Sequence, residues 1–465
     1  MPVALEPFVP SSGDPWDSQK AAHLLRRAGF GPLPREIAAA TAVGPDRAVD
    51  ALFVFPPALP IPPVALGDAQ AAEMRLDAEL ELLRSTRQRA QDHPELRGFY
   101  EQVNQAHGRA IVETTSWWLD RMASGPAPLQ EKLVLFWHGH FTSSFGDVQD
   151  AIAMYNQNQL FRQYAAGNFA RLFDAVARDP AMLRYLNNDQ NQRGRPNENW
   201  AREAMELFTM GIGHYTEDDV REAARAWTGW TVVDYRSFQD RRTFAFKPAE
   251  HDGGQKTFLG QTGPWDGTDV MRIILATPAA PQWVAARLAK FFVAPQPPAE
   301  LVDGLAGLLR QNNYELAPVL RALFRSRAFY RPDVMHAQVK SPTEYVVGAV
   351  RHLGIQDADW IRLGEAMTLM GQRLFFPPTV AGWDGGAAWM NSGTVFTRSD
   401  VAAALLVGRL GVPNLAPLGS PEAISAQLLA RPLAPARQAV LAQTSVPSMT
   451  GVIHLVMTLP EYHVA

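Results

Sequence analysis

Two glutamates three residues apart mark the stretch of this sequence whose residue types could do chemistry. Glu203 and Glu206 lie in the segment RPNENWAREAMELFTMGIG, which predicts a helix over 200–210 with Asn197 or Asn199 as its N-cap and a glycine at its end. Residues at this spacing share one helix face, with roughly 5–6 Å between their Cβ atoms. Because two carboxylates this close repel each other, we expect a metal ion or basic side chains to face them.

Histidines in two other segments supply ligands that a metal would need. His138 and His140 flank a glycine at the end of the apolar run 129–137, and His251 lies on a tight Gly-Gly loop. Imidazole and carboxylate groups are ligands that zinc, manganese and iron accept, and the chain has no cysteine. We therefore expect these three histidines to bind a divalent metal, zinc, manganese or iron, beside the two glutamates. Structural hydrogen bonding by the histidines is the alternative.

Polar residues before the central helix complete this predicted site. Asn187, Asn188 and Asp189 stand in the run NNDQN. In the enzyme hypothesis a metal-bound water is the nucleophile, the catalytic residues are Glu203, Glu206 and Asp189, and the two asparagines bind substrate. In the alternative interpretation the same polar residues form a turn and satisfy their own backbone.

Basic and aromatic residues distant in sequence are further candidates for substrate binding. Arg26 and Arg27 belong to the segment AAHLLRRAGFGP, and Trp383 and Arg398 lie in the Gly-, Pro- and Trp-rich segment 370–398. Guanidinium groups bind anions, and indole rings on a glycine-rich loop suit a ligand face. The alternatives are solvated arginines on a surface helix, arginines paired with the two glutamates, and aromatic rings that seal a core.

The elements that must position these groups are mainly helices. Helical spacing of apolar residues predicts a mainly α, single large domain over 1–465, with a Pro-rich linker at 54–67 and a helical hairpin at 68–124. Only 228–262 alternates β-branched and aromatic residues with polar ones, which predicts two or three short strands.

Capping residues mark three of the expected helix starts. Asp17 or Ser18 precedes the first helix, and Thr216 begins the capping-box sequence TEDD. Ser341 begins SPTE, which has proline at the first helical position and glutamate at the third.

Composition excludes several classes of protein. With 465 residues and 47% hydrophobic content the chain can bury a large core, and its net charge of -4 argues against a nucleic-acid binder. The first residues, MPVALEPFVPSSGDPW, lack the basic and apolar regions of a signal peptide, and no apolar run is long enough to span a bilayer. We therefore expect a cytoplasmic protein, or a periplasmic one if the start is misassigned.

Several segments together resemble a bacterial family, the domain of unknown function 1800 family. They are AAHLLRRAGFGP, FWHGHF, NENWAREAMELFTMGIG, YTEDDVREAARAWTGW, HDGGQKTFLG and PPTVAGWDGG. The resemblance covers residues 17 to about 400 and implies no activity, because none is assigned to the family. It does imply a partner, since members are often encoded beside sulfatase-like proteins.

Two functions remain open from the sequence. The first is a metal-dependent, hydrolase-like enzyme at the predicted His and Glu site. The second is a non-catalytic binding or scaffold protein, in which Glu203 and Glu206 form a structural ion-pair network with Arg26, Arg27 or Arg202. The sequence contains no phosphate-binding loop of the G-x-x-x-x-G-K-[ST] type and no G-x-S-x-G motif.

Overall fold

Helices dominate the protein, as the sequence predicts. The computed structural model describes residues 5–57, 60–86, 89–233, 237–431, 434–437, 439 and 448–465. The chain is 62% helical, and within the described residues its strands form two small antiparallel pairs. The mainly α fold class is therefore confirmed.

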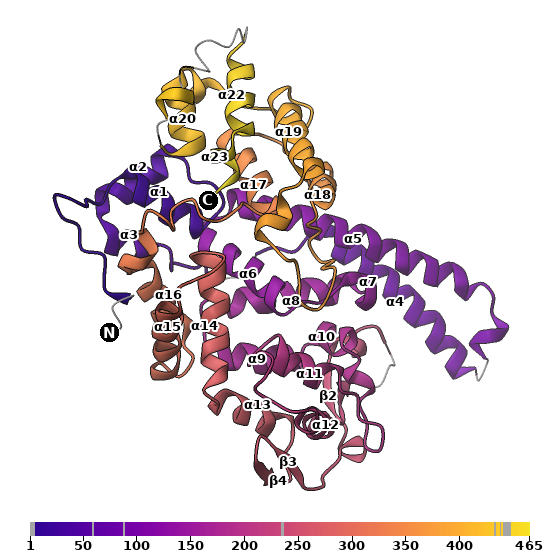
Figure 1. Ribbon diagram of the computed structural model, residues 1–465. Helices are drawn as coiled ribbons and strands as arrows, with labels where there is room; N and C mark the ends of the chain where they lie inside the picture. Colours follow the sequence, from indigo (N-terminus) through magenta and orange to yellow (C-terminus); the bar gives the residue numbers. More distant parts are fainter. Residues whose placement is uncertain are drawn as a thin grey trace.

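The helices follow one another with short connections (Figure 1). The N-terminal helices are α1 (Ser18–Arg27), α2 (Pro34–Val43), α3 (Pro45–Ala51), α4 (Val64–Ser85), α5 (Leu96–Ser124) and α6 (Pro128–His140). The middle helices are α7 (Phe145–Val148), α8 (Ala151–Gln163), α9 (Phe169–Ala177), α10 (Pro180–Tyr185), α11 (Asn199–Glu206) and α12 (Glu217–Ala226). The later helices are α13 (Gly267–Ala276), α14 (Ala279–Phe292), α15 (Ala299–Gln311), α16 (Leu316–Arg325), α17 (Pro342–His352), α18 (Trp360–Leu369), α19 (Ser392–Leu406), α20 (Pro421–Leu429), α22 (Met449–Thr458) and α23 (Pro460–His463).

The expected helix starts are confirmed where a side chain caps them. Asp17 accepts a hydrogen bond from the amide of Lys20 at 2.9 Å and begins α1. Thr216 begins α12 and Ser341 begins α17, each with a capping box. These interactions join residues three apart in sequence, so the sequence alone can specify them.

Two helix ends differ from expectation. The central helix α11 ends at Glu206, because the next amides bond five residues back: Met210 N–H donates to the Met205 carbonyl at 2.8 Å. Its N-cap residue is Glu198, which makes no side-chain cap. Helix α6 continues through His140, so both histidines lie in its last turn and not beyond its end.

The centre of the molecule is built on α6 and α8. Figure 1 shows these helices between the α17–α23 region at one end and α9–α13 at the other. Almost every side chain of α6 is buried, including its charged ones. Glu131 on α6 accepts hydrogen bonds from Arg162 on α8 at 2.7 Å and from the Trp118 indole on α5 at 3.1 Å. This buried ion pair therefore joins the three central helices.

The long helices α4 and α5 pair and project from one side of this centre (Figure 1). Helix α4 begins at Val64, inside the segment 54–67 predicted as a linker, and residues 58–59 of that segment lie outside the described residues. None of the described helices combines the length and apolar composition that a bilayer crossing needs.

The described residues of the β excursion contain four three-residue strands. Strand β1 (Trp230–Val232) pairs with β2 (Phe244–Phe246), and β3 (Lys256–Phe258) pairs with β4 (Gln261–Gly263). Both pairs are antiparallel. Part of the predicted strand region, 234–236, lies outside the described residues.

Replacing Glu131 tests the central ion pair. Glu131→Gln leaves the buried Arg162 guanidinium without a carboxylate, which costs about 3–5 kcal/mol when one partner of a buried pair is removed. We expect urea denaturation to show a loss of that size. The control Glu101→Gln breaks an exposed pair with Arg97 and should cost less than about 1 kcal/mol. Equal losses in the two variants would contradict the central role of Glu131.

Candidate functional site

The two glutamates of α11 lie at a half-buried position. Burial, followed by the neighbouring charge of Glu206, raises the pKa of Glu203. Glu206 accepts a hydrogen bond from the Tyr215 hydroxyl at 2.7 Å. Arg202 pairs with Glu198 and Glu217 instead of with these glutamates. Among the described residues Glu203 has no hydrogen-bond or ion-pair partner, so the network expected with arginines is not formed here.

Both histidines of α6 are engaged in structural hydrogen bonds. His138 Nε2 accepts the backbone N–H of Phe375 at 3.0 Å, and its ring packs against Trp118 and Trp383. His140 Nε2 donates to the Phe208 carbonyl at 3.0 Å, which leaves its buried Nδ1 without a partner. Burial lowers the pKa of each histidine to about 3. Both rings are therefore neutral at physiological pH.

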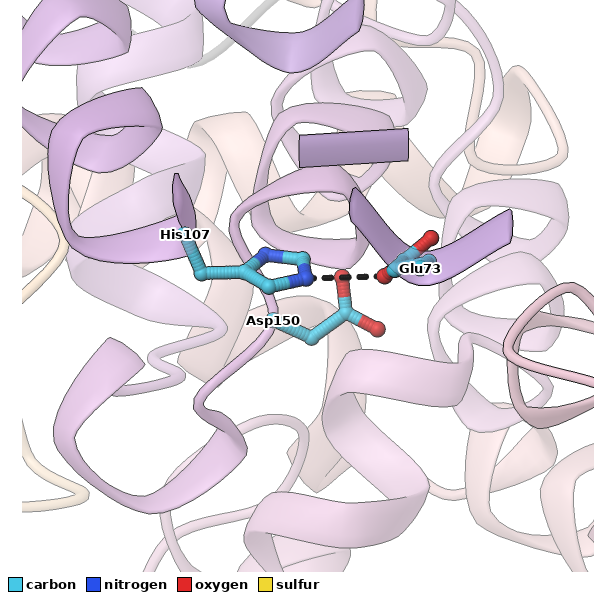
Figure 2. Close-up of side chains that lie close together, drawn as sticks. All are labelled: Glu73, His107 and Asp150. Carbon is cyan, nitrogen blue, oxygen red and sulfur yellow. Dashed lines mark hydrogen bonds and ion pairs between the residues drawn. The ribbon is translucent and has the colours of Figure 1, made fainter. Parts of the chain in front are cut away.

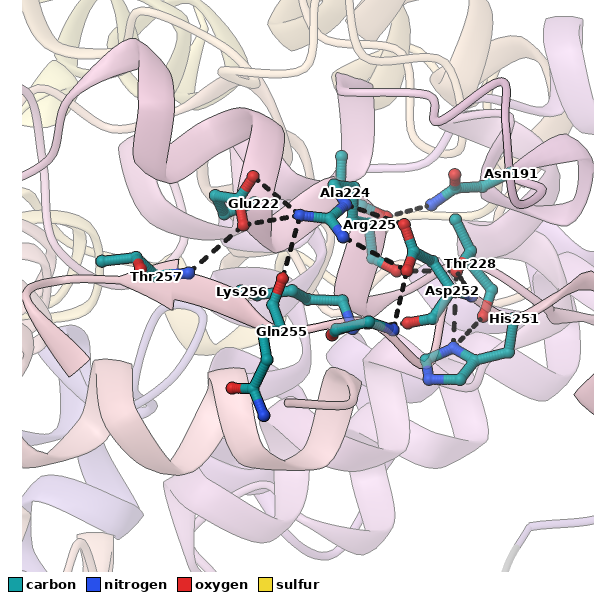
Figure 3. Close-up of polar contacts among 11 residues, drawn as sticks. Asn191, Glu222, Ala224, Arg225, Thr228, His251, Asp252, Gln255, Lys256 and Thr257 are labelled. Atoms are coloured by element: carbon teal, nitrogen blue, oxygen red, sulfur yellow. Dashed lines mark hydrogen bonds and ion pairs between the residues drawn. The ribbon is translucent and has the colours of Figure 1, made fainter. Parts of the chain in front are cut away.

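His251 belongs to a different cluster, shown in Figure 3. Its Nδ1 donates to the Thr228 carbonyl at 2.9 Å. Beside it, Arg225 of α12 donates to Asp252 at 2.7 Å and to Glu222 at 2.8 Å. The HDGG loop is thus clamped to α12, and the contacts of His251 are structural.

The polar run before α11 bonds mainly to backbone. Asn187 adopts a left-handed conformation with φ 55°, as asparagine in a turn often does. Asn188 donates to the Trp230 carbonyl at 3.2 Å, and the carbonyl of Asp189 accepts from Thr231 at 2.9 Å. Burial raises the pKa of the Asp189 carboxyl. These contacts are those of a turn that fastens α10 to β1.

One group in the described part of the chain has ligand spacing for a metal, and it is a set that the sequence did not single out. Atoms of Glu73, His107 and Asp150 lie within 4.8 Å of one another (Figure 2). However, Arg242 donates to both carboxylates, to Glu73 at 3.0 Å and to Asp150 at 2.8 Å, and Arg184 donates to Asp150 at 3.1 Å. The guanidinium of Arg242 already supplies the positive charge that a metal would bring.

A second buried cluster surrounds Glu344 on α17. The basic residues in it come from the N-terminal, central and C-terminal segments: Arg26, Arg27, Lys132, Lys340 and Arg398. Lys132 forms an ion pair with Glu344. The cluster therefore holds more buried positive charge than its carboxylate balances.

The predicted substrate-binding arginines lie in this cluster and donate mostly to carbonyls. Arg26 donates to the Leu429 carbonyl at 3.0 Å, Arg27 to the Val334 carbonyl at 2.9 Å, and Arg398 to the Lys340 carbonyl at 2.8 Å. Burial lowers the pKa of Arg27 to about 9. Arg27 Nε and two nitrogens of Arg398 are buried without a partner. The contacts of these arginines leave unused donors inside the protein.

A cavity of about 370 Å³ opens next to this cluster. Its volume lies within the range of about 300–1,000 Å³ that small-molecule sites occupy. Its polar and aromatic lining residues come from five segments of the chain: Arg27, Arg287, Glu344, Gln372, Trp383, Asp384 and Trp389. The last turn of α6 contributes Gly139.

Arg287 of α14 is the least satisfied group of this cavity. Its guanidinium makes no hydrogen bond and no ion pair with any described residue, although the side chain is partly buried. Burial lowers its pKa, and its charge contributes to the lowered pKa of His140. A guanidinium has five N–H donors, so Arg287 presents an unused anion-binding group to the cavity.

The turn that carries Trp383 is held tightly against α6. Gly382 has φ +84°, and a Cβ atom there would lie 2.7 Å from the Gly139 carbonyl oxygen. Glycine is therefore required by both conformation and space. This contact explains the glycine before Trp383 in the segment AGWDGG.

Comparison with known proteins assigns the chain to a family. Residues 23–464 match the profile of a family described as "Protein of unknown function (DUF1800)". This chain belongs to that family. Among curated proteins and solved structures, none matches it.

Five of the six segments that carry the DUF1800 resemblance lie at two places in the structure. The segments HLLRRAGFG, FWHGHF and AGWDGG each contribute a residue to the cavity. The segments YTEDDVREAARAWTGW and HDGGQKTFLG instead build the clamp on α12. Sequence reasoning missed Arg287 and Gln372, which stand in ordinary helical and loop sequence without a motif.

Acid titration tests the buried histidines. In the unfolded chain a histidine binds a proton near pH 6.5, whereas folded His138 and His140 remain neutral down to about pH 3. The contribution of these two histidines to the free energy of unfolding should therefore be fully present above pH 6.5. It should fall as the pH drops from 6.5 towards 3, by up to about 1.4 kcal/mol per pH unit for each histidine. We expect His140→Gln to reduce this slope in denaturation measured at pH 7, 6, 5 and 4. The exposed control His214→Gln should retain it.

Replacing Arg242 tests the group in Figure 2. If its guanidinium balances Glu73 and Asp150, Arg242→Met should destabilise the fold by about 3–5 kcal/mol, and adding zinc, manganese or iron should leave the wild-type melting temperature unchanged. The exposed control Arg109→Met should be neutral. One equivalent of bound metal that Glu73→Gln removes would refute this interpretation.

Proposed function

We propose that this DUF1800 protein binds an anionic organic ligand in the cavity between α1, α6, α14, α17 and the 383–389 turn. Of the two functions that the sequence left open, this is a binding role. The observation that carries it is Arg287, a partly buried guanidinium that lines the cavity and has no acceptor among the described residues. Leaving buried charge unpaired is costly, so a ligand anion is its natural partner.

The charge around the cavity supports the same proposal. Arg27 and Lys290 line it together with Arg287. Glu344 offers little compensation, because one of its oxygens is paired with Lys132 and the other accepts the Ser341 amide at 2.7 Å. Arg27, Arg287 and Lys290 outnumber the two carboxylates of the lining, Glu344 and Asp384, so the net charge of the lining is positive, which favours anions over neutral molecules.

Metal-dependent hydrolysis at His138, His140 and His251 has less support. His138 Nε2, His140 Nε2 and His251 Nδ1 are each committed to a backbone hydrogen bond, so each histidine keeps at most one ring nitrogen for a metal. Of the ring nitrogens of these three described histidines, His140 Nδ1 is the one that is buried without a hydrogen-bond partner. Elemental analysis of the purified protein tests this alternative directly.

The binding proposal is tested with simple oxyanions. Sulfate, phosphate, acetate and citrate are added at constant ionic strength, with chloride as the reference, and the melting temperature is measured. We expect at least one oxyanion to stabilise the wild type. A hydrogen bond to a charged group contributes about 1.5–3 kcal/mol, so Arg287→Met should weaken binding roughly tenfold to a hundredfold.

The matched control is Arg171→Met, which removes an exposed arginine from α9. It should bind the same oxyanion as tightly as the wild type. The proposal fails if no oxyanion exceeds the chloride reference, or if both arginine variants bind as the wild type does.

A further inference from the structure

Several hydrogen-bond donors on the lining of the cavity have no acceptor among the described residues. Gln372 Oε1 accepts the amide and hydroxyl of Thr343, at 3.0 and 2.8 Å, whereas its Nε2 donates to no described residue. The indole N–H groups of Trp383 and Trp389 likewise have no acceptor in the described part of the chain. A ligand that fills the cavity must therefore offer several acceptor oxygens, and not one acid group alone.

The lining also carries a free carboxylate. Asp384 follows Trp383 directly, is exposed, and has no hydrogen-bond or ion-pair partner among the residues that the structure describes. A group placed between Asp384 and the indole or amide donors has to donate and accept at once. A hydroxyl does both, whereas a carboxylate or phosphate only accepts.

The aromatic wall adds a flat apolar surface. Trp383 is half-buried, with the His138 ring 5.6 Å away between centroids, and Trp389 is 7% exposed. Large aromatic side chains bury ligand area at low conformational cost, and an indole also offers its N–H at the edge. A planar aromatic acid would pack on this wall but would leave the free amide and Asp384 without partners.

From these observations we infer that the anionic ligand is an acidic sugar, a pyranose ring that carries a carboxylate. This inference rests on the proposed function and names the class of ligand. Arg287 pairs with the carboxylate, Gln372 and Asp384 bind ring hydroxyls, and the Trp383 indole packs on the C–H face of the ring. A cavity of about 370 Å³ has room for a ring of this size.

Calorimetric titration of the full chain separates the two parts of the ligand. Glucuronate and galacturonate carry both the pyranose ring and the carboxylate. Glucose and galactose carry the ring alone, and acetate carries the carboxylate alone. We expect at least one uronate to bind at least tenfold more tightly than its neutral sugar and at least tenfold more tightly than acetate.

Two variants separate the contribution of the carboxylate to the binding affinity from that of the ring. Arg287→Met should bring the affinity for the uronate down to that for the neutral sugar, because the carboxylate loses its partner. Trp383→Leu should bring it down to the level of acetate, because the ring loses its wall. Trp265→Leu, in the connection between β4 and α13, is the matched control and should bind as the wild type does. Unchanged circular dichroism verifies that each variant is folded.

The outcomes distinguish this inference from the proposed function. If acetate binds as tightly as either uronate and the binding depends on Arg287, the anion site stands and the sugar is overturned. If neither the uronates nor acetate bind, the sugar is overturned, and the proposed function is overturned with it only where sulfate, phosphate and citrate also fail to stabilise the protein. If an anion binds and Arg287→Met does not weaken it, both are overturned.

Discussion

The buried ion pair between Glu131 and Arg162 is the interaction on which the arrangement of the central helices depends. A carboxylate in the core is tolerated only where its oxygens are fully hydrogen-bonded, and Glu131 receives bonds from Arg162, Arg121 and Trp118. These partners lie on α5 and α8, so the ion pair fixes the position of α6 relative to both. The last turn of α6 lines the cavity. The ion pair of Glu131, near the other end of the same helix, therefore also fixes the position of this turn.

Charge is distributed unequally among the buried polar clusters. In the Glu73 group and in the α12 clamp, each carboxylate has an arginine and each arginine has carboxylates. Around Glu344 the basic groups outnumber the carboxylate, and Arg287 has no partner in the described residues. Because satisfied networks stabilise a fold without needing a ligand, the unbalanced cluster is the one that indicates binding.

The sequence predicts those features of the fold that depend on residues close together in the chain. The helix starts at Asp17, Thr216 and Ser341 follow from side chains that bond three residues away. The early end of α11 could not be predicted from the sequence. The turn after it is closed by a hydrogen bond from Met210 to Met205, five residues back, and no local sequence pattern specifies such a bond. Similarly, the spacing of His138 and His140 is equally compatible with a metal site and with two backbone hydrogen bonds. The backbone groups that these histidines bind come from segments far along the chain, so the local sequence does not decide between the two.

The cavity is assembled from parts of the chain that are separated by several hundred residues, from Arg27 to Trp389. Contacts of such long sequence separation pay the full entropy of closing a large loop, so they form late in folding. During synthesis the indole wall emerges after the guanidinium groups of α1 and α14. A chain interrupted before residue 383 would therefore lack the complete site, and ligand binding would report that the whole chain has folded.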